Sequence, residues 1–128
     1  MTVLDASALV NLLLHDDSRE STRAIFDHDV YAPAILVPET INALKRIATS
    51  RQISKTRARE KVALLSVLPV DLIPMQRLSL DVWELSETFS TYDACYVSVA
   101  RQFGTTLLTR DRKLAASAMR FVDVRILN

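Results

Sequence analysis

Short apolar segments alternate along the chain with longer segments of helical spacing, and this alternation constrains the fold more than any other feature. We expect strands at residues 3–4, 30–32, 70–73 and 106–109, and a last one within 121–127. The expected helices cover residues 6–14, 18–26, 38–49, a segment from 54 onward, 79–88 and 93–103, with a short helix after 111. Brief buried strands that alternate with helices predict an α/β/α sandwich with a central, mostly parallel sheet.

Serine and proline set several of the expected boundaries. Ser18 and Ser54 have the side chain of a helix N-cap. Pro33 is expected to stop the strand before it, because proline cannot donate to a sheet ladder. Pro38 falls where the first turn of a helix tolerates proline.

Length and composition favour one globular domain over residues 1–128. Hydrophobic residues make up 49% and charged residues 24%, a balance that excludes a disordered chain. The formal net charge of +1 excludes a strongly basic coat for nucleic acid, although local patches remain open. No apolar run reaches the roughly 20 residues of a membrane span, so we expect a cytoplasmic protein without a membrane partner.

The scarcest residue types exclude several kinds of site. Cys95 is the single cysteine, which excludes an internal disulfide and a cysteine-rich zinc site. Gly104 is the single glycine, which excludes glycine-rich phosphate loops. The two histidines, His15 and His28, stand in polar surroundings and are expected at the surface. Carboxylates, hydroxyls and arginines therefore remain as the groups available for chemistry.

Acidic residues at strand and helix ends are the strongest candidates for a site. Asp5 ends the first strand, Asp111 follows the fourth, and Glu39 and Asp93 fall in first helical turns. Each of them alone can be explained as a residue that caps a helix or interacts with its dipole. Together they are harder to explain, because carboxylates that converge in a partly buried pocket repel one another and resist ionisation.

A bound divalent cation would account for such a cluster. Oxygen ligands without histidine favour Mg²⁺ or Mn²⁺ over zinc. Such an ion screens a phosphodiester, lowers the pKa of a bound water and stabilises charge on the leaving oxygen. The reaction that this implies is hydrolysis of a phosphodiester.

Four segments resemble, in order and spacing, the four motifs of PIN-domain ribonucleases, and most closely those of the VapC toxins of toxin–antitoxin pairs. These segments are residues 3–10 (VLDASALV), 37–44 (VPETINAL), 91–100 (TYDACYVSVA) and 107–114 (LLTRDRKL). The resemblance spans nearly the whole chain and implies a PIN-like fold. It also implies a metal-dependent endoribonuclease that leaves 3′-hydroxyl and 5′-phosphate ends.

The resemblance implies roles for single residues. Asp5, Asp93 and Asp111 would hold Mg²⁺ or Mn²⁺ directly or through water, and Glu39 would complete the cluster through a second ion or the attacking water. Two hydroxyls, Ser7 and Thr109, match supporting positions beside the carboxylates. Leu114 departs from the family pattern, which often has an aromatic residue there, and this difference affects packing but not the ligands.

The resemblance also implies partners. VapC-like proteins pair with a small VapB-like antitoxin, which blocks the acidic pocket with its C-terminal segment and binds DNA through its other end. They commonly form homodimers and larger assemblies with the antitoxin. The substrate would be RNA, and the sequence does not indicate which RNA.

Basic residues form two groups that could contact RNA. Lys45 and Arg46 begin a stretch that continues through Arg51, Lys55, Arg57, Arg59 and Lys61. Arg110 and Arg112 flank Asp111 and are better placed to meet a phosphate near the metal. For both groups the alternative is an ordinary solvated surface.

Other residues have a structural explanation beside a functional one. Cys95 is expected to be a buried core thiol, because no histidine is placed to activate it. Trp83 is expected in the core, with an interface as the alternative. The same two possibilities, burial or a homodimer surface, apply to an apolar segment made of Leu64, Leu65, Val67 and Leu68.

Two other functions compete with the nuclease. A phosphoryl-accepting domain would also place an aspartate at a strand end, but it needs an acidic pair there, and position 7 is Ser7. A catalytically inactive RNA- or protein-binding module would share the fold. Because all four expected acids are present, the sequence favours the active enzyme.

Overall fold

The structure, a computed structural model, describes residues 1–15 and 19–127, without the side chains of residues 19–21. The predicted N-cap Ser18 lies outside the described residues. The strands are β1 (Thr2–Leu4), β2 (Val30–Pro33), β3 (Asp71–Ile73), β4 (Thr106–Thr109) and β5 (Val124–Ile126). The helices are α1 (Ala6–Leu14), α2 (Arg19–Phe26), α3 (Leu36–Thr49), α4 (Lys55–Leu64), α5 (Ser79–Leu85), α6 (Thr91–Phe103) and α7 (Arg112–Ala118), with 3-10 turns at Leu65–Val67 and Gln76–Leu78.

All five predicted strands are present, and the differences lie at element boundaries. Helix α3 begins at Leu36, before Pro38, because the first N–H groups of a helix need no partner and a proline fits there. Strand β2 includes Pro33 instead of stopping before it. Helix α6 begins two residues earlier than predicted, because the Ser90 hydroxyl accepts a hydrogen bond from the Asp93 N–H at 3.1 Å and caps the helix. Helix α5 ends at Leu85, three residues before the predicted end.

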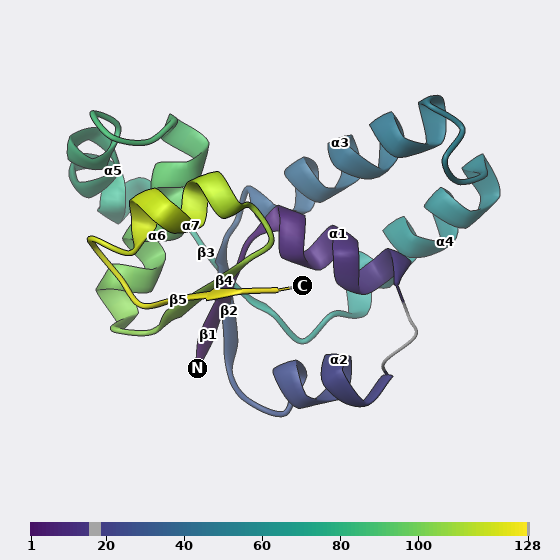
Figure 1. The fold of residues 1–128 in the computed structure, drawn as a ribbon, viewed down its shortest axis with the longest axis horizontal. Helices are drawn as coiled ribbons and strands as arrows, with labels where there is room; N and C mark the ends of the chain where they lie inside the picture. The colour runs from purple at the N-terminus through teal and green to yellow at the C-terminus, as the bar shows by residue number, and fades with distance from the viewer. Residues whose placement is uncertain (16–18, 128) are drawn as a thin grey trace.

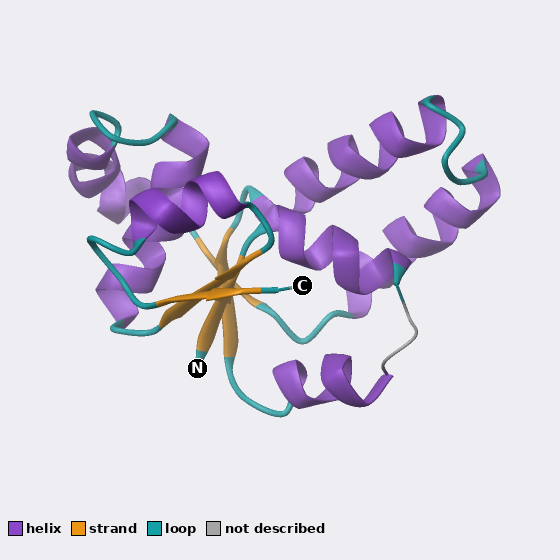
Figure 2. Ribbon diagram, in the orientation of Figure 1, coloured by secondary structure: helices purple, strands orange, loops and turns teal. Residues whose placement is uncertain are grey.

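The sheet is entirely parallel, in the order β3-β2-β1-β4-β5. The chain moves from β1 outward through β2 to β3, and then returns to β4 and moves outward to β5. Right-handed crossovers require the helices of these two halves to lie on opposite faces of the sheet. Accordingly, α1 to α4 cover one face and α5 to α7 the other (Figure 2). The predicted α/β/α sandwich is confirmed.

The core lies between the central strands and the helices on both faces. Val3, Leu4, Leu107 and Leu108 on β1 and β4 are almost completely buried. Such strands are apolar on both sides because each face of the sheet is covered. Helix α6 is buried at every residue from 94 to 100, since it packs on the sheet beneath α5. The predicted burial of Cys95 is confirmed, as is the surface position of His15 and His28.

Several apolar side chains that were expected in the core are instead exposed. Trp83 on α5 is 75% exposed and its neighbour Leu80 is 69% exposed, so the core assignment of Trp83 is wrong. At the end of α4, Leu64 is 43% exposed, and beyond it Val67 is 73% exposed, while Leu65 and Leu68 pack against the core. The homodimer that such surfaces suggest stays a prediction.

Helices α3 and α4 form a hairpin that extends away from the sheet, with α1 beside it (Figure 1). Within residues 1–15 and 19–127, no helix is long and apolar enough to cross a membrane. The reversal of strand order lies between β1 and β4, whose carboxyl ends lead into Asp5 and Arg110. In open parallel sheets, ligands bind in the crevice outside such a reversal.

The one glycine has a defined structural task. Gly104 ends α6 with φ +58°, a left-handed conformation that costs other L-residues about 1 kcal/mol or more. A Cβ at this position would meet nothing within 4 Å, so the cost of a substitution comes from the backbone alone.

We predict that Gly104→Ala lowers the free energy of unfolding by about 1 kcal/mol in urea denaturation. Gly104→Asn should lose less, since asparagine tolerates this conformation, and equal losses would contradict the argument.

Candidate functional site

The four acidic side chains singled out from the sequence line a single cavity. Its volume is about 410 Å³. The turn after β1 and helix α1 contribute Asp5, Ala6, Ser7 and Val10, helix α3 contributes Glu39, Ala43 and Arg46, helix α6 contributes Asp93 and Tyr96, and the turn after β4 contributes Asp111. The cavity therefore lies where the sheet topology predicts a binding crevice.

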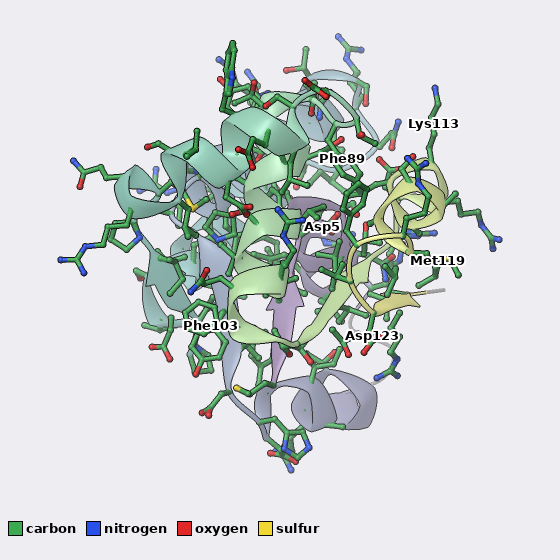
Figure 3. All side chains as sticks on the ribbon, turned by 90° about the vertical axis from the view of Figure 1, so that its left-hand side faces the viewer. Asp5, Phe89, Phe103, Lys113, Met119 and Asp123 are labelled. Atoms are coloured by element: carbon green, nitrogen blue, oxygen red, sulfur yellow. The ribbon has the colours of Figure 1, made fainter. Side chains whose placement is uncertain are left out.

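Asp5 is the most deeply buried of the acids, with 4% of its surface exposed. Its Oδ1 accepts hydrogen bonds from the Ser7 hydroxyl at 2.7 Å and the Ala8 N–H at 2.9 Å, and so caps α1. Its Oδ2 accepts from the Thr109 hydroxyl at 2.5 Å. Both carboxylate oxygens are thus held in place. Figure 3 shows Asp5 in the interior, whereas Lys113 on α7 extends outward.

The two hydroxyls predicted beside the carboxylates connect the turns after β1 and β4. The Thr109 hydroxyl donates to Asp5 and accepts from the Asp111 N–H at 3.0 Å. The Ser7 hydroxyl donates to Asp5 and accepts from the Arg110 N–H at 3.0 Å. Each hydroxyl therefore bonds to both turns, although Ser7 and Thr109 are far apart in the sequence.

Glu39 is positioned by a residue that the sequence analysis did not select. The Tyr96 hydroxyl, from α6, donates to Glu39 Oε1 at 3.0 Å. Tyr96 is only 2% exposed, and burial together with the neighbouring Glu39 charge raises the pKa of its hydroxyl. Tyr96 lies one helical turn after Asp93 and so shares its face of the helix, which is the signal that would have identified it.

Asp111 has a structural task as well as a place in the cavity. Its Oδ1 accepts from the Lys113 N–H at 2.9 Å and the Leu114 N–H at 3.0 Å, and so caps α7. The capping interpretation is therefore confirmed for Asp5 and Asp111, and both residues also line the cavity. Leu114 itself is buried in the core, away from the cavity lining.

The acids affect one another's ionisation. Burial raises the pKa of Asp5, of Glu39 and of Asp93 above the ordinary carboxyl values. Neighbouring negative charges add to the effect: Asp111 acts on Asp5 and Asp93, and Asp93 acts on Glu39. Hydrogen bonds from Thr109, Tyr96 and Ser90 oppose these shifts without cancelling them. The cluster thus has a cost in the folded protein that a bound cation would offset.

The donor set fits a hard divalent cation. It consists of carboxylate and hydroxyl oxygens, which suit Mg²⁺ or Mn²⁺. Within the described residues, however, no group of three His, Cys, Asp or Glu side chains is close enough to hold one ion. The fold thus brings the four acids to one cavity without placing three of them within reach of a single ion.

The predicted RNA-contacting residues separate into two sets. Arg46 lines the cavity, whereas Lys45 and Arg112 are exposed and do not line it. Arg110 donates through its guanidinium to the Asn11 side chain on α1. Farther along the basic stretch, the Arg57 guanidinium donates to the Leu14 carbonyl at 2.7 Å, which is a structural contact. Of the basic residues named from the sequence, only Arg46 lines the same cavity as the acids.

Known proteins with similar sequences are ribonucleases. The PIN-domain family model matches residues 2–118. Ribonuclease VapC12 of Mycobacterium tuberculosis is 32% identical over 118 residues, which cover 91% of this chain and 92% of that protein. Ribonuclease VapC1 of the same organism is 33% identical over 118 residues, with 90% and 89% covered.

Solved structures agree with the sequence relatives. PAE2754 from Pyrobaculum aerophilum superimposes with a TM-score of 0.71 at 27% identity, covering 95% of this chain and 82% of that one. A chain of VapBC2 from Rickettsia felis, bound to a DNA fragment from its promoter, gives a TM-score of 0.69 at 14% identity and shows the same fold, with 99% and 98% covered. The chain therefore belongs to the PIN-domain family and is a relative of its VapC ribonucleases.

Proposed function

We propose that this chain is a metal-dependent endoribonuclease that acts as the toxin of a VapBC-type toxin–antitoxin system. The observation that carries the proposal is the convergence of four acids, from four separate segments, on one cavity. The relatives named above as VapC ribonucleases support RNA as the substrate. Since RNA and a toxin's targets are found in the cytoplasm, we expect it to act there.

Each acid has a separate role in the proposed site. Asp5, Asp93 and Asp111 would hold Mg²⁺ or Mn²⁺, directly or through water. When bound, such an ion would supply a more acidic water and stabilisation of charge on the leaving oxygen. Glu39 Oε1 accepts the Tyr96 hydrogen bond, so we assign Oε2 to a second ion or to the attacking water. Ser7 and Thr109 hold Asp5 in the orientation that the site needs.

The proposed partner is a VapB-like antitoxin. The structure of VapBC2 from Rickettsia felis, which has a similar fold and is bound to a DNA fragment from its promoter, supports this partner. An antitoxin segment that enters the acidic cavity would block it. A homodimer and a larger assembly with the antitoxin complete the proposal.

The direct test is cleavage of total cellular RNA by purified protein with Mg²⁺, with Mn²⁺ and with EDTA. We expect metal-dependent cutting that leaves 5′-phosphate ends. Asp5→Asn and Asp93→Asn should each lower the rate about a hundredfold or more, since each removes a charge that stabilises the transition state. Asp71→Asn is the matched control, because Asp71 is exposed on β3 and does not line the cavity.

Two results would contradict the proposal. Cutting that survives in EDTA, or in both cavity variants, would mean that the acids do not form the active site. Absence of cutting by folded, antitoxin-free protein across total RNA would favour the inactive binding module.

The raised carboxyl pKa values predict how stability depends on pH. A carboxyl whose pKa is raised by folding stabilises the protein below its unfolded value, about 4, and loses that contribution as pH rises through the folded value. In EDTA the melting temperature should therefore be higher at about pH 5 than at about pH 7.5. Mg²⁺ should raise it more at the higher pH, since its ligands must be deprotonated.

Asp93→Asn serves as the control for the pH measurement. It removes one of the raised groups, so the pH dependence in EDTA should become shallower and the stabilisation by Mg²⁺ smaller. A wild-type melting temperature that rises with pH in EDTA would refute the prediction.

The buried hydroxyl of Thr109 gives a test of how the site is held. We predict that Thr109→Val lowers the free energy of unfolding by about 1–3 kcal/mol, because it leaves Asp5 Oδ2 and the Asp111 N–H without this partner. Urea denaturation measures the loss, and RNA cleavage should fall with it. Thr105→Val is the matched control: its buried hydroxyl has no hydrogen-bond partner within the described part of the chain, so removing it should cost little. Equal losses for the two variants would contradict the assignment.

A further inference from the structure

Among the described residues, one basic side chain lines the acidic cavity. Arg46 lies on α3 seven residues after Glu39, with Ala43 between them, and all three line the cavity. Residues spaced by four and then three positions share one face of a helix. Seven residues correspond to about 10 Å along the helix axis. Helix α3 therefore contributes both an acid, Glu39, and a basic residue, Arg46, to the lining of the same cavity.

No salt bridge joins Arg46 to the acids among the described residues. The groups that lower the pKa values of Asp5, Glu39 and Asp93 are hydrogen-bond partners, and the Arg46 charge is not among them. Within the described residues the ion pair found joins Arg101 of α6 to Asp81 of α5. These two helices lie on the other side of the sheet from α3 (Figure 1). Arg46 is exposed, so its charge is available to an anion that enters the cavity.

An RNA strand presents anions at regular intervals. If one phosphate lies at the acids, a neighbouring phosphate lies farther along the strand, where a basic residue of the same cavity lining, Arg46, can contact it. Arginine binds phosphate through two parallel N–H bonds, which fixes orientation as well as affinity. Phosphate contacts set the position of a nucleic acid and do not read its sequence.

We propose that Arg46 binds a phosphate of the RNA other than the one that is cleaved, and so positions the strand along α3. This inference rests on the proposed function. The proposal distinguishes Arg46 from two other basic residues. Lys45 does not line the cavity, and Arg110 donates a hydrogen bond to the Asn11 side chain. In this proposal Arg46 is a positioning residue and not a catalytic residue.

The kinetic test compares three single substitutions in metal-dependent cleavage of an RNA oligonucleotide. Arg46→Ala should raise KM about tenfold, the effect of one charged hydrogen-bonded contact, with kcat within about twofold of wild type. Arg77→Ala is the matched control, since it removes the same charge from an exposed site outside the cavity. Lys45→Ala should have a much smaller effect than Arg46→Ala. Equal effects of Lys45→Ala and Arg46→Ala would overturn the proposal, because they would indicate diffuse attraction.

A binding test separates this inference from the proposed function. A fluorescently labelled oligoribonucleotide is titrated with Asp93→Asn protein, with and without Arg46→Ala, over a range of salt concentrations. Removing one phosphate contact should reduce the slope of log affinity against log salt by about 0.7. Binding that is unchanged by Arg46→Ala would overturn the role of Arg46 even if the wild type cleaves RNA. If the wild type does not cleave RNA but Arg46→Ala still reduces the salt slope of binding, the nuclease proposal is overturned and the phosphate contact of Arg46 is supported.

Discussion

The hydrogen bonds of the buried Asp5 carboxylate are the interaction on which the rest of the site depends. Asp5 caps α1 through Oδ1 and accepts the Thr109 hydroxyl through Oδ2. Thr109 in turn receives the Asp111 N–H, and Asp111 caps α7. One chain of bonds thus fixes two helix starts on opposite faces of the sheet. It does so at the strand reversal, where a parallel sheet opens a crevice.

This arrangement places charge where folding alone would not favour it. Burial and mutual repulsion oppose ionisation of Asp5, Glu39 and Asp93. The supporting hydrogen bonds reduce that cost, and the proposed cation would remove much of it. The stability of the fold, its dependence on pH and the affinity for a metal therefore all depend on the protonation state of these carboxyl groups. Arg46, seven residues after Glu39 on α3, lines the same cavity and is the proposed contact to a second phosphate of the RNA.

The sequence predicted much of the fold and the four acids because their signals are local. Apolar strand segments, helical spacing and an aspartate at a strand end can each be read within a few residues. Trp83 was misassigned because hydrophobicity favours burial, whereas α5 turns this side chain to solvent at 75% exposure. Tyr96 was missed because its partner Glu39 lies on another helix, and no local pattern indicates that contact.

The sequence by itself determined the order of strands and helices, the number of acids and their position at strand and helix ends, since these follow from short-range periodicity and capping chemistry. The tertiary structure alone decided which side chains meet. It brought the hydroxyl of Thr109 to Asp5, joined Tyr96 to Glu39, and separated Arg46 from Lys45. The physical reason is that these pairings depend on the crossing of elements distant in the chain, which sheet order and helix packing fix, and not on spacing within any one segment.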